Sequence, residues 1–280
     1  MSSEPARRAI STVRVCALDG DQVRDVPDKV VTEEPMEIRL HGPGQEPEAL
    51  AVTMRTPGHD FELAVGFCLT EGLLRSVDDL DSVAYCLAGQ AEQEYNVVTV
   101  KLRAPVDRRG HTRTFVANAS CGLCGKTTLD DIEQHVPPVA DGPTLKRSVL
   151  ASLPERLREA QRVFDATGGL HAAARFAPDG ELVALREDVG RHNALDKLVG
   201  HALLERELPL SAAVLMVSGR VSFEIVQKAA MAGIPVVCAV SAPSSLAVDA
   251  ARRLGQTLVG FVRGDRANVY TRPDRLDLGH

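Results

Sequence analysis

The sequence of 280 residues contains no tryptophan and few other aromatic residues, with three tyrosines and seven phenylalanines. Proteins that bind single-stranded nucleic acids stack bases on aromatic side chains, so this scarcity argues against such a surface. Positive charge is not in excess either, because 38 acidic residues outnumber 32 lysines and arginines and the formal net charge is −6. We therefore expect no nucleic-acid partner.

Long apolar runs are also missing. The run at residues 212–217 is typical, and it falls far short of the roughly 20 residues that a membrane-spanning helix needs. The first eight residues, Met1–Arg8, lead into no apolar signal core. We expect a cytoplasmic protein without a membrane partner, and reducing conditions there leave the six cysteines for metal binding, catalysis or packing.

Cys121 and Cys124 form the most informative pattern, a Cys-x-x-Cys sequence that includes Gly122 and is followed by Gly125 and Lys126. A strand pattern precedes the pair and a helix-capping pattern follows it, so the two thiols are expected on a loop. A thiolate is the reactive form of cysteine, and a nearby cation or helix start lowers the pKa of a thiol. The pattern predicts sulfur chemistry at Cys121 and Cys124.

Other uses of this segment fit less well. Residues 125–127 imitate the end of a phosphate-binding P-loop, but Ser120 stands where that motif needs glycine. A zinc site needs two further ligands, and neither a second Cys-x-x-Cys nor a paired arrangement of His111 and His135 supplies them, so no structural metal is expected. Thiol–disulfide exchange stays open, although the pair does not directly open a helix and has no aromatic neighbour.

The remaining cysteines occur singly within apolar or strand-like segments. We interpret all four as small core residues, which is the usual behaviour of isolated cysteines. They are Cys16, Cys68, Cys86 and Cys238.

The sequence divides into two predicted domains. Residues 1–143 begin with a polar lead-in of about 25 residues, continue with short strands and one helix from Phe61 to near Gly72, and form a smaller α+β domain that ends in the Cys-x-x-Cys loop. A linker rich in proline and glycine precedes residues 144–280, where strands alternate with helices and predict an α/β domain with a largely parallel sheet. The predicted helices cover 145–164, 193–206, 223–232 and 246–254, and the predicted strands cover 170–176, 181–186, 212–217, 235–240 and 257–262.

Four loops of the second domain combine small, hydroxyl-bearing and charged residues. Loops that follow the strands of an α/β sheet meet at one edge, and helix starts and arginines suit phosphate, so these loops predict a phosphate-bearing ligand. Ser222 and Ser244 fit simple helix caps as well, and His192 fits a ligand contact or an ordinary half-buried residue equally. The loops cover residues 187–192, 218–220, 241–245 and 263–266.

Several sequence blocks resemble the formate dehydrogenase accessory sulfurtransferase family (FdhD). They occur in the family's order between about residues 30 and 272. The blocks are Thr56–Gly58, Glu62–Phe67, Ser120–Lys126, Glu187–Lys197, Ser218–Arg220, Ser222–Glu224 and Ser241–Ala247.

This resemblance implies a sulfurtransferase that accepts persulfide sulfur from a cysteine desulfurase. The sulfur would pass to the molybdenum cofactor, Mo-bis-molybdopterin guanine dinucleotide, before its insertion into formate dehydrogenase. Cys121 would carry the persulfide, Cys124 would assist or resolve it, and the protein would be a homodimer. The implied cofactor-binding stretch is Phe261, Val262, Arg263, Gly264, Asp265 and Arg266. The alternative is a non-catalytic molybdenum-cofactor-binding chaperone that only displays its cysteines.

The resemblance also implies a cytidine-deaminase-like, three-layer C-terminal domain. Zinc deaminases need a His-x-Glu and a Pro-Cys-x-x-Cys sequence to hold their metal. The corresponding helix starts, at residues 191–193 and 218–222, contain no cysteine. Deaminase activity is therefore excluded.

Overall fold

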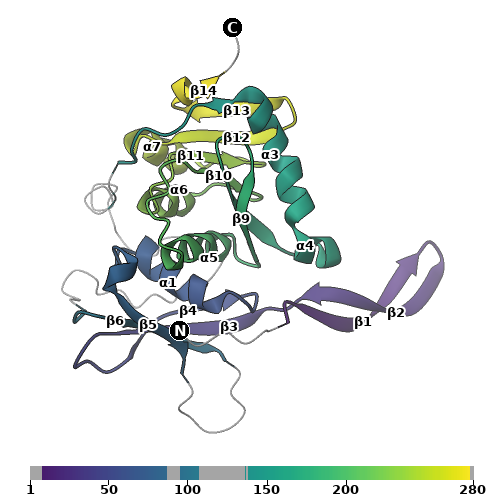
Figure 1. Cartoon of the computed structure of the whole chain (residues 1–280). Helices are drawn as coiled ribbons and strands as arrows, with labels where there is room; N and C mark the ends of the chain where they lie inside the picture. The colour runs from purple at the N-terminus through teal and green to yellow at the C-terminus, as the bar shows by residue number, and fades with distance from the viewer. Residues whose placement is uncertain (1–7, 87–94, 107–135, 137, 278–280) are drawn as a thin grey trace.

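The computed structural model describes residues 8–86, 95–106, 136 and 138–277 (Figure 1). The larger of its sheets has six strands in the order β13-β12-β11-β10-β8-β9. These strands are β8 (His171–Phe176), β9 (Leu182–Asp188), β10 (Val214–Val217), β11 (Val236–Ala239), β12 (Thr257–Arg263) and β13 (Arg266–Thr271).

The expectation of a largely parallel sheet is wrong at both edges. Only β10, β11 and β12 run parallel to one another. Strands β8, β9 and β13 are antiparallel to their neighbours. Short turns join β8 to β9 and β12 to β13, and a strand that returns through a short turn must pair antiparallel.

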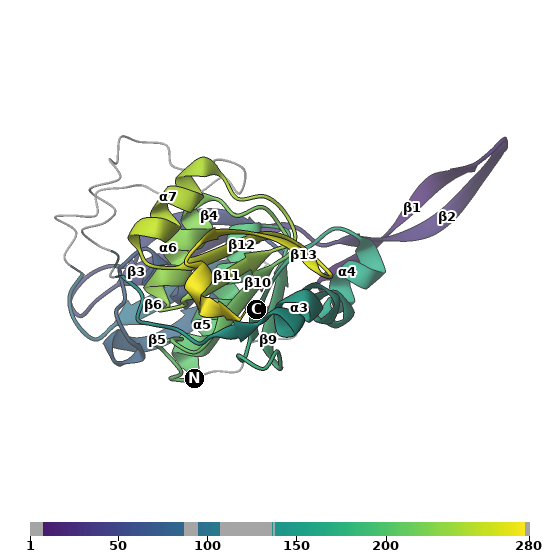
Figure 2. The same ribbon diagram turned by 90° about the horizontal axis from the view of Figure 1, so that it is seen from above.

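Helices cover both faces of this sheet, as Figures 1 and 2 show. One face carries α3 (Arg147–Ala160) and α4 (Arg162–Thr167), and the other carries α5 (Arg191–Leu204), α6 (Phe223–Met231) and α7 (Ser245–Arg253). Alternate strand residues serve the two faces, because Met216 shares a core with Leu153 of α3 while Leu215 shares a core with Leu198 of α5. The helix predicted over 145–164 is two helices, separated at Gln161.

The N-terminal half contains a four-stranded sheet in the order β4-β3-β6-β5. Its strands are β3 (Glu34–His41), β4 (Glu48–Arg55), β5 (Leu80–Tyr85) and β6 (Val97–Leu102). The predicted alternation is confirmed in β3, where Met36, Ile38 and Leu40 are buried. The predicted helix is confirmed as α1 (Asp60–Thr70), and it packs against α5.

Two glycines allow α1 and α5 to approach closely. A Cβ atom added to Gly66 would overlap the carbonyl oxygen of Asp196, and one added to Gly200 would overlap the carbonyl oxygen of Glu62. One hydrophobic core therefore continues from the four-stranded sheet through α1 and α5 to the six-stranded sheet.

The polar lead-in expected over residues 1 to about 25 is wrong for its described part. Residues 10–31 form a hairpin of β1 (Ile10–Asp19) and β2 (Gln22–Val31) that projects from the body of the molecule (Figure 2). Its two-residue turn contains Gly20 at a φ of 60°, the left-handed conformation that tight hairpins use.

Short elements complete the structure. They are the single turns η1 (Val77–Asp79) and η2 (Pro273–Arg275) and the paired strands β7 (Leu145–Lys146) and β14 (Leu276–Asp277). None of the helices in the described part of the chain is long and apolar enough to cross a membrane.

Candidate functional site

The predicted loops meet at one edge of the six-stranded sheet. Strands β9, β10, β11 and β12 all end at this edge, and the antiparallel β8 begins there. The loop after β10 joins the loop after β11, because the Val221 N–H donates to the carbonyl of Ala242 at 3.1 Å. The Phe261 N–H donates to the carbonyl of Ser241 at 3.2 Å and brings β12 to the same place.

The predicted cofactor-binding stretch divides into three environments. Phe261 has a left-handed φ of 54° and is 38% exposed at the sheet edge. Val262 is buried in the core beneath α3, so it serves packing. Residues 263–266 form an exposed turn between β12 and β13, where Arg263 and Arg266 present two cations suited to an anionic group.

Asp188 ties the loop after β9 to the N-terminal half. Its Oδ2 accepts from the Thr56 N–H at 3.1 Å and forms an ion pair with Lys197 Nζ at 2.7 Å. Its Oδ1 accepts from the Gly190 N–H at 2.8 Å and from Asn193 Nδ2 at 3.1 Å. Asp188 therefore anchors Thr56 and the start of α5 instead of facing a ligand.

His192 stands at the start of α5 and faces the start of α6. Its Nε2 lies 3.1 Å from Ser222 Oγ and 3.9 Å from a carboxylate oxygen of Glu224. Burial, followed by the positive charges of Arg191 and Lys228, lowers the pKa of His192 to about 4. The half-buried imidazole is therefore neutral at pH 7 and can exchange hydrogen bonds with the Ser222 hydroxyl.

The two candidate capping serines behave differently. Ser244 caps α7, since its hydroxyl accepts from the Ala247 N–H at 3.2 Å. Ser222 makes no side-chain cap to α6, and its hydroxyl is directed to His192 instead. The capping interpretation is confirmed for Ser244 and is wrong for Ser222.

His171 is a site residue that the sequence did not reveal. It begins β8 and lies so close to Gly219 that a Cβ atom there would be 3.1 Å from His171 Nδ1. Burial lowers the pKa of His171, and the charges of Arg191 and Arg220 lower it further. Nothing in the local pattern marks this residue, because only the antiparallel course of β8 brings it to the edge where β10 ends.

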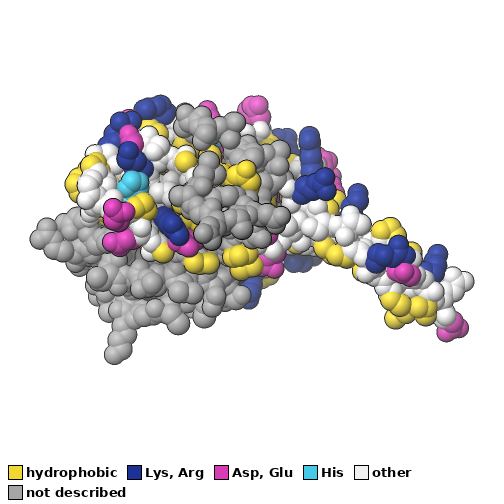
Figure 3. Space-filling view, turned by 90° about the horizontal axis from the view of Figure 1, so that it is seen from below, with side chains coloured by type: hydrophobic (Ala, Val, Ile, Leu, Met, Phe, Trp, Pro, Cys, Tyr) yellow, Lys and Arg dark blue, Asp and Glu magenta, His cyan; other side chains and the backbone are white. Residues whose placement is uncertain are grey.

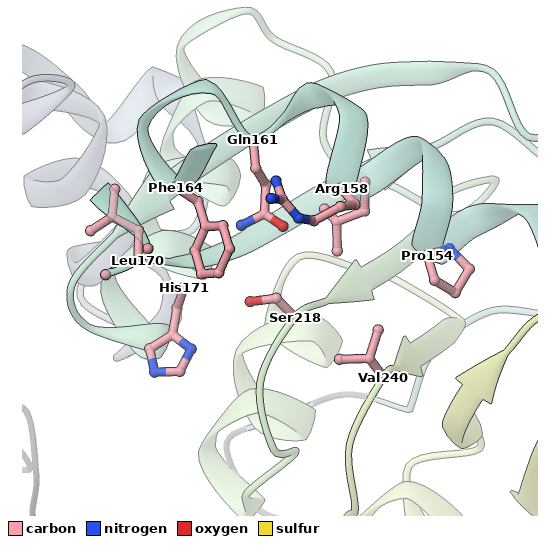
Figure 4. Close-up of a pocket in the computed structure, with 11 residues that line it drawn as sticks. Pro154, Arg158, Gln161, Phe164, Leu170, His171, Ser218 and Val240 are labelled. Atoms are coloured by element: carbon pink, nitrogen blue, oxygen red, sulfur yellow. The ribbon is translucent and has the colours of Figure 1, made fainter. Parts of the chain in front are cut away.

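A cavity of about 480 Å³ opens beside this edge, between the sheet and the helices α3 and α4 (Figure 4). Gln161, Phe164, His171 and Ser218 surround the hollow, and Leu157 and Val240 add apolar wall. An aromatic ring, a neutral imidazole, a hydroxyl and an amide around one cavity suit a flat, polar ring system.

The start of α4, which carries Phe164, is held by a carboxylate near the end of β9. Glu187 accepts from the Val163 N–H at 3.1 Å and from the Phe164 N–H at 2.9 Å, and so satisfies the first turn of α4. Gln161, which precedes α4, is only 3% exposed, and within the described structure its Nε2 has no hydrogen-bond partner. A buried amide donor of this kind favours an acceptor supplied by a ligand.

The cysteines expected in the core are only partly there. Cys68 and Cys238 are buried, which raises the pKa of both thiols, that of Cys238 to about 12. Cys86 is half-buried. Cys16 is exposed on β1, so its assignment to the core is wrong, because the hairpin that carries it has no core of its own.

The predicted sulfur-carrying residues, Cys121 and Cys124, lie outside the described residues. Elsewhere, in the part of the chain that the structure describes, no three histidine, cysteine, aspartate or glutamate side chains gather as a metal site requires.

Comparisons with known proteins give one consistent result. The model of the FdhD/NarQ family matches residues 31–277. The chain is 56% identical to the sulfur carrier protein FdhD of Streptomyces coelicolor, with 90% of each chain covered. It is 50% identical to the protein of the same name from Mycobacterium tuberculosis, covering 94% of this chain and 97% of that one.

A more distant relative and a solved structure agree with these matches. The sulfur carrier protein FdhD of Saccharolobus solfataricus is 43% identical, with 94% of this chain and 99% of that one covered. The fold is also similar to a crystal structure from Desulfotalea psychrophila, provisionally assigned as a formate dehydrogenase accessory protein. That match has a TM-score of 0.75 at 23% identity and covers 96% of this chain and 100% of that one.

Proposed function

Because the chain belongs to the FdhD/NarQ family, we propose that it is a sulfurtransferase that serves the maturation of formate dehydrogenase. It takes sulfur from the persulfide of a cysteine desulfurase and delivers it to Mo-bis-molybdopterin guanine dinucleotide before that cofactor enters the enzyme. The observation that carries the proposal is the pair Cys121 and Cys124 beside Lys126, in a chain whose relatives are named sulfur carriers.

The proposed chemistry begins with the Cys121 thiolate. It attacks the outer sulfur of the desulfurase persulfide, so that a new sulfur–sulfur bond forms on Cys121 and the desulfurase cysteine leaves as a thiolate. Lys126 is the cation that favours the thiolate form of Cys121. Carriage on a covalent persulfide prevents the loss of free sulfide.

Release of the carried sulfur requires two electrons, and Cys124 can supply them. Its thiolate attacks the inner sulfur of the Cys121 persulfide, a disulfide forms between the two cysteines, and the outer sulfur leaves at the oxidation level of sulfide. A dithiol reductant must then reduce that disulfide before the next cycle. This assigns Cys124 the resolving role.

The sheet edge is the proposed binding site of the cofactor to which sulfur is delivered. The two nucleotide arms of that cofactor carry pyrophosphates and flat ring systems. The exposed guanidinium groups of Arg263 and Arg266 suit the former, and the cavity around Phe164 and Gln161 suits the latter. The neutral His192 adds no positive charge to this edge and leaves anion binding to the arginines.

Further parts of the proposal rest on the family alone or on the strand order. A cysteine desulfurase and a formate dehydrogenase are the proposed protein partners, the proposed location is the cytoplasm, and the proposed assembly is a homodimer. The order β9-β8-β10-β11-β12, with helices on both faces, supports a cytidine-deaminase-like arrangement of the C-terminal domain. The proposed domains remain residues 1–143 and 144–280.

The decisive experiment loads the protein with sulfur. We expect mass spectrometry, after incubation with a desulfurase and cysteine, to find a gain of one sulfur atom on the peptide that contains Cys121. Cys121→Ala should lose this adduct and abolish formate dehydrogenase maturation in cells, while Cys124→Ala should keep the adduct and weaken maturation. Cys16→Ala, which removes an exposed cysteine outside the motif, is the matched control and should behave as the wild type.

Failure of this experiment has a definite meaning. Full maturation with Cys121→Ala and no sulfur adduct on the wild type would contradict the sulfurtransferase and leave the alternative, a non-catalytic chaperone that binds the molybdenum cofactor.

A further inference from the structure

The hairpin of β1 and β2, which we call the arm, projects beyond the body in both views of the fold (Figures 1 and 2). At its base, the end of β2 lies against α4. Ten large hydrophobic side chains are exposed among the described residues, and four of them are on the arm: Val13, Leu18, Val23 and Val30. A two-stranded ribbon without a covered face is marginally stable in water, so the arm is suited to burial against a partner.

The pairing register assigns each side chain to a face of the arm. Val15 is opposite Val26, and positions two residues apart along each strand share a face. One face, called the valine face, therefore holds most of the apolar side chains of the two strands. They are Val13, Val15 and Ala17 in a row on β1, Val26 opposite Val15, and Val30 beyond Asp28. The opposite face is polar at its centre, where Arg14 and Asp25 form an ion pair at 2.7 Å, and it carries Leu18 and Val23 near the tip of the arm. Apolar and charged side chains are both visible on the surface of the arm in Figure 3.

The charges on the valine face are complementary to themselves. Arg24 and Asp28 stand two residues before and two residues after Val26, so they share its face. A second arm can pack its valine face against the first through a two-fold axis. This axis lies between the two faces, runs perpendicular to the strands and passes through the level of Val26. That axis places Arg24 of each copy against Asp28 of the other and Val26 against its own counterpart.

The same axis brings Val13 over Ala17 of the second copy and Ser11 over Asp19, and it places the Gln22 amide over Val30. Arg24 also pairs with Asp19 of its own chain at 2.7 Å, but both side chains are largely exposed and such pairs contribute little. This internal pair does not prevent Arg24 from facing a second carboxylate. An unrelated partner would not require charges placed symmetrically about one valine.

We propose that two copies of the chain associate by packing their valine faces together, with the arms antiparallel and Arg24 paired with Asp28 across the interface. This inference deepens the homodimer of the proposed function and rests on it, but it needs no step of the sulfur chemistry. A ribbon face of this length measures roughly 33 Å by about 10 Å, so two faces bury on the order of 700 Å², below the usual size of stable interfaces. We therefore expect a weak dimer that dissociates on dilution.

Sedimentation velocity on the full chain, over a series of micromolar concentrations, tests the interface. Arg24→Asp sets a carboxylate against Asp28 at both ends of the two-fold contact, and it should raise the dissociation constant at least tenfold. The double variant Arg24→Asp/Asp28→Arg should restore the wild-type constant. The double variant still lacks the ion pair between residue 24 and Asp19 of the same chain. Recovery of the wild-type dissociation constant would therefore come from contact between the two copies. Lys29→Asp makes the same change of charge on the opposite face and should leave the dimer unchanged.

Each other outcome overturns the interface. A wild-type protein that stays monomeric throughout the series would reject both the homodimer and the valine-face contact. A wild-type dimer that is unaffected by Arg24→Asp, or a double variant that stays dissociated, would reject the contact and keep the homodimer. Sulfur loading of Cys121, read by mass spectrometry, is measured separately, so failure of the sulfur chemistry cannot be mistaken for failure of the interface.

Discussion

Asp188 ends β9 and His192 lies in the first turn of α5, and these near neighbours in sequence have different roles. Asp188 is fully buried and holds the backbone of Thr56, which precedes it by more than a hundred residues. His192 is half-buried beside Ser222 at the sheet edge. Within the sequence block Glu187–Lys197, Asp188 therefore stabilises the fold and His192 faces the site. The residue types alone do not reveal these different roles.

We predict that the His192 imidazole takes up a proton only at acidic pH. Burial and neighbouring positive charges lower its pKa to about 4 from the usual 6.5, so the folded protein binds this proton less readily than the unfolded chain. The associated loss of stability therefore begins as the pH falls below 6.5 and is complete below about 4. NMR of ¹³C-labelled histidine, with His192→Gln to assign the signal, should show no titration of His192 above about pH 5. A midpoint near that of histidine in the urea-unfolded chain would contradict the burial argument.

The crossing of α1 and α5 is the decisive contact between elements. Both helices offer glycine where they touch, and the atoms that a Cβ would strike are backbone carbonyls, which cannot turn aside as a side chain can. This contact links the N-terminal half to the site. Helix α5 begins at the sheet edge, and α1 directly follows the turn at residues 56–58, where the Thr56 N–H bonds to Asp188.

Substitution of these glycines should show the effect. We expect Gly66→Ala and Gly200→Ala each to lower the free energy of unfolding by about 3 kcal/mol or more, the upper range for overpacking. Gly168→Ala is the control, since Gly168 has a φ of 71° with open space around it and should cost only about 1 kcal/mol of backbone strain. Urea unfolding measures all three. Equal losses would show that backbone freedom, and not the close helix contact, is what these glycines provide.

At the scale of the whole molecule, charge as well as apolar packing joins the two halves. Glu62 of α1 accepts from Arg186 of β9 at 2.7 Å and from His201 of α5 at 3.2 Å. Burial alone would raise the pKa of Glu62, but hydrogen bonds from Arg186 and His59 outweigh it and lower the pKa from 4.5 to about 2. This carboxylate therefore stabilises the folded state fully above about pH 4.5, and that stability is lost as the pH falls towards 2.

Acid unfolding should reveal this contribution. A shift of this size corresponds to roughly 3 kcal/mol, so Glu62→Gln should be less stable than the wild type by about that amount at neutral pH. The difference should shrink between about pH 4.5 and 2 and vanish below. Urea titrations of both proteins across this range give the measurement. A difference that does not change with pH would mean that Glu62 acts through packing and not through its charge.

Elements with a local pattern could be predicted from the amino-acid sequence. The alternation of Met36, Ile38 and Leu40 predicted a strand, and the helix-and-strand spacing of the second half located β8 to β12 and α5 to α7 to within a few residues. It missed the edge strand β13 and the division of α3 from α4. The family resemblance followed from short blocks of residues in order, and the family match confirms it. The roles of Cys121 and Cys124 stay predictions of the sequence, because those residues lie outside the described structure.

The way in which these elements meet could not be predicted and became clear from the fold. It set the antiparallel edges of the sheet, revealed the arm, placed His171 at the site and joined Asp188 to Thr56. Each of these depends on contacts between residues far apart in the chain, or on the direction in which a strand returns. Local periodicity reports which face of an element is buried, whereas the partner that buries it is chosen by the packing of the whole molecule.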